Sequence, residues 1–345
     1  MKKSLITFAV AAAIAAPMTA NAAEAKAKSK FFGYTQITAA YGKGQYDNND
    51  ADGLRFGADS VRLGYKLKYD KIWGMLQIDV NKTDKADNIG IPEIIKDAVV
   101  GYKFKDVAKV SAGVFKTPVG MDFSNPSKQL DITKRGMETG LVLERAAGLM
   151  LSGRSSGGFG YDLGVFNPAQ RSAAVDYGSA GDGIAYAGRL LYDMGETFHA
   201  EASYGTSTQD SSATGEDYTV WGLGSTFKTG AMVFKAEYVA GTDVKGKKGY
   251  EESVWFLHAG YAINKKNEVV IRHYAANSKK GDGSETDLGN TYIGWNIFLA
   301  ENKKNARVQL NYVVATGDDK TFSGAATKKY AYTDDVFLAQ FQVGF

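Results

Sequence analysis

The end of the chain alternates between apolar and polar side chains. In Val336–Phe345, residues Phe337, Phe341 and Phe345 fall on one face, and Gln340 and Gln342 fall on the other. Successive side chains of a β-strand point to opposite faces, so this is the pattern of a strand with one apolar and one polar surface. Similar alternating segments recur along the whole chain. The pattern predicts an all-β fold of short two-faced strands.

The first residues predict export. Lys2 and Lys3 form a basic start, Leu5 to Ala16 an apolar run, and Ala20-Asn21-Ala22 a small-residue cleavage site. The apolar run is too short to span a bilayer as a helix. We therefore expect residues 1–22 to be a cleaved signal peptide and residues 23–345 to form one exported domain. A retained N-terminal anchor is the alternative.

Composition narrows the class further. The 40 glycines and 5 prolines favour many strands joined by tight turns, and the 20 tyrosines and 18 phenylalanines suit the aromatic girdles of a membrane barrel. Cysteine is absent, which excludes disulfides and thiolate metal sites. The formal net charge of +3 includes Lys2 and Lys3, and this balance argues against a nucleic-acid partner. No cofactor and no metal are expected.

Short and long connections alternate along the chain. Short links are expected at Asp70-Lys71, Asp106-Val107, Ser155–Gly158, Met194–Glu196, Thr229-Gly230, Asn264–Asn267 and Glu301–Asn305. Long polar segments are expected at Lys43–Leu54, Thr83–Pro92, Thr117–Thr139, Pro168–Gly183, Ser207–Glu216, Asp243–Gly249, Asn277–Glu285 and Gly317–Ala331. These links separate about 16 strands, and turns on one side with loops on the other are typical of an outer-membrane barrel. The sequence thus predicts a transmembrane antiparallel β-barrel in the outer membrane of a Gram-negative bacterium, surrounded by lipid and lipopolysaccharide.

The charged residues of the alternating strands define the inner face. A charge on the lipid face costs roughly 2–4 kcal/mol at mid-bilayer, so the charges must point inward. An interior with this many charges cannot be a dry core, and a barrel of about 16 strands is wide enough for an aqueous channel. The strand residues predicted to line it are Arg62, Lys66, Arg189, Lys235, Arg272 and Arg307, with Asp79, Glu201 and Glu237.

The third long connection, Thr117–Thr139, differs from the others. It contains Pro118 and Pro126, which interrupt strand pairing. It also combines the apolar residues Val119, Met121, Phe123, Leu130 and Ile132 with the basic residues Lys128, Lys134 and Arg135, preceded by Lys116, and the acidic residues Asp122, Asp131 and Glu138. A solvated loop has little use for apolar anchors, so we expect this loop to fold into the lumen and narrow it. The alternative is a surface loop that caps the mouth.

Four segments resemble one known family. Arg62–Leu67, Asp97–Tyr102, Ala112–Gly120 and Glu144-Arg145-Ala146 follow the order of the "DAYLEY", "GQFKEPFG" and "ERA" elements of the phosphate-selective porin O/P family. The resemblance covers roughly residues 62–154, and Val114 and Thr117 replace the family's Gln and Glu. It implies a homotrimeric porin of about 16 strands and makes Lys116 a pore-lining cation.

These observations predict a porin for passive diffusion of small hydrophilic solutes. Basic residues outnumber acidic ones in the predicted lumen, and rings of Lys and Arg favour anions, so a weak preference for anions, with phosphate among them, is expected. A non-selective general porin is the alternative, and cation preference is a further one. Alternatives of another class are an outer-membrane barrel enzyme, for which His199 and Glu201 are the candidate residues, and a plugged adhesin. We expect no enzymatic activity.

Overall fold

The computed structural model describes residues 27–42, 53–82, 94–168, 183–208, 217–303, 305–317 and 325–345. The predicted signal peptide, residues 1–22, lies outside the described residues. Within the described ranges, no helix is long and apolar enough to cross a membrane. The strands are β1 (Lys28–Gly42), β2 (Leu54–Tyr69), β3 (Ile72–Asp79), β4 (Ile95–Lys105), β5 (Ala108–Lys116), β6 (Arg145–Arg154), β7 (Phe159–Phe166), β8 (Ala185–Met194), β9 (Phe198–Ser207), β10 (Tyr218–Thr229), β11 (Met232–Thr242), β12 (Glu251–Asn264), β13 (Asn267–Lys279), β14 (Glu285–Phe298), β15 (Ala306–Gly317) and β16 (Val336–Gly344).

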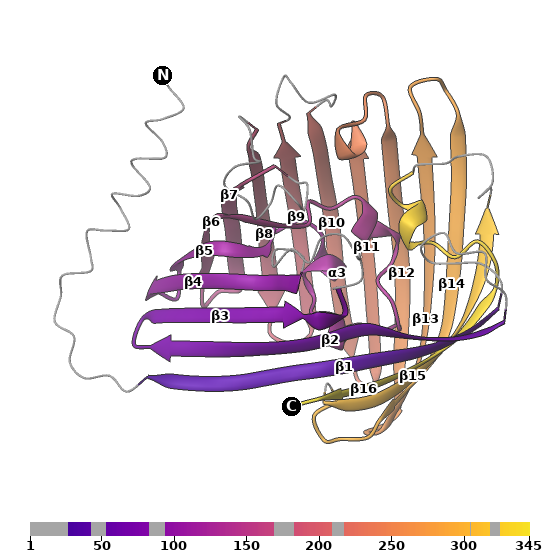
Figure 1. Ribbon diagram of the computed structural model, residues 1–345, viewed down its shortest axis with the longest axis horizontal. Helices are drawn as coiled ribbons and strands as arrows, with labels where there is room; N and C mark the ends of the chain where they lie inside the picture. The colour runs from indigo at the N-terminus through magenta and orange to yellow at the C-terminus, as the bar shows by residue number, and fades with distance from the viewer. Residues whose placement is uncertain are drawn as a thin grey trace.

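The strands form one closed antiparallel barrel, as the alternation predicts. Each strand pairs with its neighbours in the sequence, and β16 returns to pair with β1, with Gln36 opposite Gln342. Figure 1 shows β16 at the yellow end of the chain beside the indigo β1. Closure gives every strand two partners, so no edge is left with unpaired backbone groups in the membrane. The predicted all-β barrel is confirmed.

The described connections lie close to their predicted places, with small shifts at their ends. The predicted connection Thr83–Pro92 lies outside the described residues, as do parts of Lys43–Leu54, Pro168–Gly183, Ser207–Glu216 and Gly317–Ala331. The turn expected at Thr229-Gly230 lies between Thr229 and Met232, and the third long connection runs from residue 117 to residue 144, beyond its predicted end at Thr139. Short 3-10 helices occur at η1 (Val80–Lys82), η4 (Val244–Gly246) and η5 (Lys328–Tyr330). The strands therefore follow the sequence pattern, and the third loop is five residues longer than predicted.

Side chains alternate between an exposed outer face and a covered inner face. On β14 the outward Ile293 is 54% exposed, whereas the adjacent Tyr292 is fully buried. Ile293 lies beside Ile271 on β13 and Tyr312 on β15, which are also exposed. A barrel in water would leave this apolar band uncovered, so the band is the surface that lipid covers.

The Ile293→Arg substitution places a charge in this band and is expected to destabilise the folded barrel by about 2–4 kcal/mol. Refolding into lipid vesicles across a denaturant series measures this change. Asp282→Arg serves as a control, because Asp282 lies in the connection between β13 and β14. Equal unfolding midpoints for the two variants would contradict the assignment of the outer face to lipid.

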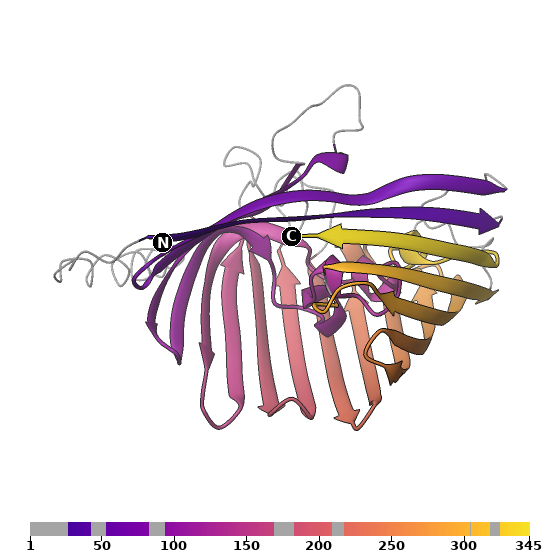
Figure 2. The same cartoon turned by 90° about the horizontal axis from the view of Figure 1, so that it is seen from below.

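The third loop, residues 117–144, is called loop L3 below. It contains α3 (Met121–Ser124), η2 (Ser127–Gln129) and η3 (Met137–Gly140). Figure 2 shows these short helical turns inside the ring of strands. All five predicted apolar anchors of the loop are buried, from Val119 and Ile132 at 0% exposure to Met121 at 6%. The expected infolding of the loop is confirmed, and the alternative of a cap over the mouth is wrong.

Candidate functional site

Loop L3 is held first by a carboxylate on β11. The Glu237 carboxylate accepts hydrogen bonds from the backbone N–H groups of Met121 at 2.6 Å and Asp122 at 2.9 Å. The N–H of Gly120 donates to Ser203 Oγ on β9 at 3.2 Å. The first N–H groups of a helix have no partner within the helix, so Glu237 supplies the acceptors that α3 needs. The start of the loop is thereby fixed to the wall.

A buried guanidinium holds the middle of the loop. Arg272 on β13 has no exposed side-chain surface and lies 3.3 Å from an oxygen of Asp122 and 2.8 Å from one of Asp131. Lys235 on β11 lies 2.7 Å from the same oxygen of Asp131. Because an unpaired buried charge is costly, each of these groups depends on the others. The loop and the wall therefore share one network of charges.

Polar side chains of the wall then bind the loop backbone itself. Arg307 donates to the carbonyl of Leu130 at 2.9 Å, and Asn296 donates to that of Asp131 at 3.0 Å. At Thr133 the backbone N–H donates to Asn311 Oδ1 at 2.8 Å, and the carbonyl accepts from Gln340 at 3.0 Å. These contacts reach β14, β15 and β16, on the opposite side of the ring from β5 and β6. Loop L3 consequently crosses the lumen.

One glycine allows the close contact of the loop with the wall. A Cβ atom at Gly136 would lie 2.1 Å from the ring of Tyr274 on β13. The loop backbone therefore rests directly against this aromatic ring, where any side chain at position 136 would clash.

The opposite side of loop L3 carries a concentration of positive charge. We call Arg62, Lys116, Lys128, Arg135 and Arg145 the basic cluster. Arg62 and Lys128 both lie over the ring of Tyr34, at 5.4 and 5.9 Å from its centroid. Lys116 and Arg135 both donate to the carbonyl of Asn125, at 2.7 and 2.5 Å. Lys116 is paired across the sheet with Arg145. The cluster thus joins the wall of β2, β5 and β6 to the near side of the loop.

Three carboxylates accompany the basic cluster. Asp79 lies 2.9 Å from Arg62, Asp97 lies 3.3 Å from Arg145, and Asp59 pairs with Lys134 of the loop. The side chains of Arg62, Arg145 and Lys134 remain 12–21% exposed. Cations outnumber carboxylates here, so a small ion passing this side of the loop meets a positive potential.

A second line of charges follows β7, β8 and β9. Arg189 lies 2.8 Å from Asp162 and 3.2 Å from Glu201, and its Nη1 donates to Ser124 of the loop at 3.0 Å. His199 lies 2.7 Å from Asp193 and 3.2 Å from Glu201. This histidine is therefore held between two carboxylates.

The structure separates the predicted lumen residues into three groups. Arg62, Lys66, Arg189, Lys116, Lys128, Lys134 and Arg135 keep partly or fully exposed side chains in the interior, whereas Lys235, Arg272, Arg307 and Glu237 hold the loop, and Asp79 and Glu201 are covered ion-pair partners. All the strand residues in these groups have the predicted inward direction. Alternation alone could not show which of them the loop covers.

Asp59 is a charged interior residue that the alternation does not predict. A bulge pairs Gln36 with Ser60 and Ile37 with Ala58, which leaves Asp59 without a cross-strand partner. The extra residue turns the Asp59 side chain inward, where Gln340 donates to it at 2.7 Å. A strict period of two places Asp59 on the outer face. The polar run of Asp59 and Ser60 was the only available signal.

Burial changes the titration of one acid in the loop. Glu138 lies in η3, outside the spanning strands, and burial raises its pKa to about 7, with Asp122 adding to the effect and Arg272 and Arg135 opposing it. Its Oε2 atom has no hydrogen-bond partner among the described residues, whereas Oε1 accepts from Thr139. The neutral carboxylic acid is therefore the form that the seated loop favours below neutrality.

The raised pKa of Glu138 predicts that the binding of loop L3 to the barrel wall depends on pH. A released Glu138 titrates near its ordinary value of 4.5, so the seated loop binds the proton more tightly and loses stability as pH rises from about 4.5 to about 7. Current fluctuations in planar bilayers should increase between pH 5 and pH 8, and Glu138→Gln should flatten this dependence. An unchanged pH profile in the Glu138→Gln variant would contradict the assignment.

A closed antiparallel barrel with an exposed apolar outer band and a charged interior crossed by a loop defines an outer-membrane channel. The model of the Gram-negative porin family matches residues 9–320. The chain therefore belongs to the Gram-negative porin family and forms an outer-membrane channel for small solutes. No curated protein sequence matches it.

Solved structures share this fold at low sequence identity. A loop-deleted form of OmpT from Vibrio cholerae superposes with a TM-score of 0.66 at 14% identity, over 92% of this chain and 99% of its own. The anion-selective porin from Comamonas acidovorans has a TM-score of 0.63 at 14% identity, over 93% and 100%. OmpF of Salmonella typhi, solved with daunomycin, has a TM-score of 0.64 at 15% identity, over 92% and 98%. At these identities the likeness establishes the fold alone.

Proposed function

We propose that this porin is a passive diffusion channel that prefers anions, with inorganic phosphate among its solutes. The observation that carries the proposal is the basic cluster, which places Arg62, Lys128 and Arg145 beside the narrowing made by loop L3. Positive side chains at a constriction favour anions because ions there are poorly screened. The porin from Comamonas acidovorans, which shares this fold, is anion-selective, and this preference is consistent with the proposal.

The pore-lining set of the proposal consists of seven of the predicted cations, each with some exposed surface. It contains Lys116, Arg62, Lys66, Arg189, Lys128, Lys134 and Arg135. Lys235, Arg272, Arg307 and Glu237 act by positioning loop L3. Asp79 and Glu201 orient the cations that they pair with, Arg62 and Arg189. No chemical step and no cofactor are part of this function.

Three further features belong to the proposal. Residues 1–22 are cleaved on export, and the mature chain assembles as a homotrimer in the lipopolysaccharide-containing outer membrane. A trimer form of OmpT from Vibrio cholerae is among the similar structures, at 14% identity, and supports this assembly. The affiliation to the phosphate-selective O/P group within the porins rests on the four sequence segments around Lys116.

Purified protein in a planar bilayer tests the preference directly. Across a KCl gradient, the reversal potential should have the sign of chloride selectivity, and added phosphate should reduce the chloride current. A reversal potential near zero would instead favour the general, non-selective porin. A folded barrel that shows no conductance would favour the enzyme or adhesin alternative over the channel.

A further inference from the structure

The inner wall near the start of the described chain carries two pairs of lysines. Lys28 of β1 lies opposite Lys68 of β2, and Lys30 lies opposite Lys66. Like charges directly opposite each other on one face of a sheet are destabilising. Two successive pairs of this kind concentrate electrostatic repulsion in one place. A bound anion would relieve this repulsion.

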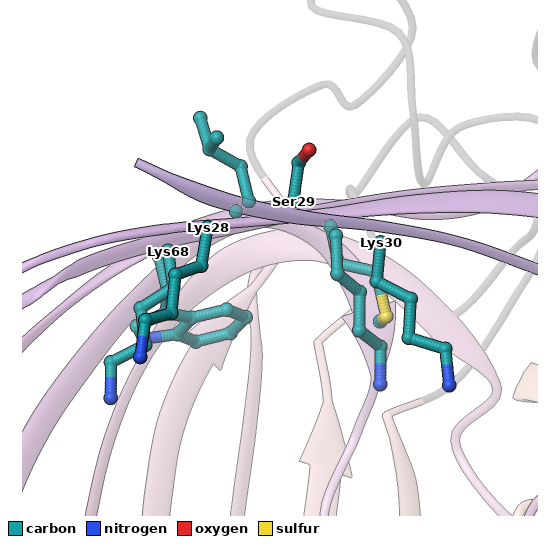
Figure 3. Close-up of a pocket in the computed structure, with 9 residues that line it drawn as sticks. Lys28, Ser29, Lys30 and Lys68 are labelled. Carbon is teal, nitrogen blue, oxygen red and sulfur yellow. The ribbon is translucent and has the colours of Figure 1, made fainter. Parts of the chain in front are cut away.

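The lysine side chains face the lumen. On β1 the residues of the same parity, Tyr34 and Gln36, are buried, and both reach Ser127 of loop L3. Figure 3 shows Lys28, Lys30 and Lys68 extending to one side of the sheet, while Ser29 extends to the other. The fourth lysine, Lys66, lies over the inward ring of Phe32 at 5.1 Å.

These four lysines differ from the cations of the basic cluster in their partners. Arg62 and Arg145 have carboxylates at 2.9 and 3.3 Å. Within the described part of the chain, no carboxylate lies within 4.0 Å of the ammonium groups of Lys28, Lys30, Lys66 or Lys68, and all four residues are exposed. Their charge is therefore available to a solute in the lumen.

The lysines surround a hollow with an apolar side. The hollow has a volume of about 460 Å³ and is lined by the four lysines together with Trp73 and Met75 of β3. The Nε1 atom of Trp73 is buried and has no hydrogen-bond partner among the described residues. A fifth cation, Lys109, lies over the Trp73 ring at 5.1 Å. The hollow thus combines several positive charges with an aromatic surface.

From this geometry we infer that the hollow is a binding subsite for small organic dicarboxylates. The two lysine pairs are two residues apart along each strand, which corresponds to about 7 Å. Two carboxylates joined by a short carbon chain can each meet one pair, while the chain contacts Trp73 and Met75. Inorganic phosphate is compact and can meet only one pair at a time. The inference rests on the proposed anion preference, which would deliver such solutes to this end of the lumen.

Blockade of the chloride current by succinate tests the subsite. Succinate added on the side of the short turns should reduce single-channel conductance at lower concentration than phosphate. The Lys30→Ala/Lys66→Ala double variant should raise the half-blocking succinate concentration about tenfold, because it removes two nearby charges. Lys30→Arg/Lys66→Arg should retain the block. Lys265→Ala/Lys266→Ala removes the same charge from the exposed β12–β13 turn and should leave the block unchanged.

The outcomes separate the inference from the proposed function. A chloride-selective reversal potential without succinate block would overturn the subsite and leave the anion channel intact. Equal or stronger block by phosphate would overturn the dicarboxylate assignment. Succinate block that depends on Lys30 and Lys66 in a non-selective channel would support the subsite and contradict the anion preference.

Discussion

Replacing Arg272 with methionine is expected to release the middle of loop L3 and to raise single-channel conductance with frequent current fluctuations. The substitution keeps a long side chain but leaves Asp122, which is 2% exposed, without the guanidinium at 3.3 Å. Removing one partner of a buried ion pair costs roughly 3–5 kcal/mol. Asp131 keeps Lys235, so the loss concentrates at Asp122. The barrel itself should still fold, because the strand pairs do not depend on this network.

The exposed pair Lys279–Glu285 provides the control for this variant. Its atoms are 3.9 Å apart and both side chains are about half exposed. Lys279→Met should therefore change stability by roughly 0–1 kcal/mol and leave the conductance unaltered. Wild-type conductance in Arg272→Met, with a heat-modifiable folded band on gels, would show that the loop is held by other contacts.

The Lys128→Glu variant is expected to move the reversal potential strongly toward cations. It changes the charge beside Tyr34 and Arg62 by two units. One charge at about 6 Å contributes about 0.7 kcal/mol in water, so two units correspond to about 1.4 kcal/mol and a tenfold change in ion preference. Measurement across a KCl gradient gives the chloride-to-potassium permeability ratio directly.

Lys265→Glu makes the same change of charge on the exposed β12–β13 turn, outside the lumen. Screening over about 8 Å at physiological salt should leave the permeability ratio of this variant close to that of the wild type. If both variants shift the ratio equally, the basic cluster does not control selectivity.

The strand pattern could be predicted from the sequence because each strand carries its own evidence. The period of two in segments such as Val308–Val314 assigns each side chain to lipid or to the lumen without knowledge of the neighbours. The apolar residues of the third loop indicated its infolding in the same local way, since Val119 and Ile132 needed a place away from water. These features depend only on residues that are close in the sequence.

The site could be predicted only in part, because its contacts join residues far apart in the chain. Nothing near Arg272 indicates that Asp122 and Asp131 will cover it, so a cation expected at the pore surface became an anchor of the loop. The bulge at Asp59 shifted one side chain out of a regular pattern. The pairing of Lys30 with Lys66 required the register between β1 and β2, which alternation does not determine.

The wall holds residues 130–133 of loop L3 by their backbone, and this affects how the sequences of such porins can diverge. Arg307, Asn296, Asn311 and Gln340 bind main-chain atoms of residues 130–133, which every amino acid except proline at position 133 would provide. Substitutions of Lys128, Lys134 or Arg135 therefore leave these hydrogen bonds in place. A lineage can change the solutes admitted at the constriction through single replacements in the loop, while the barrel that supports the loop stays the same.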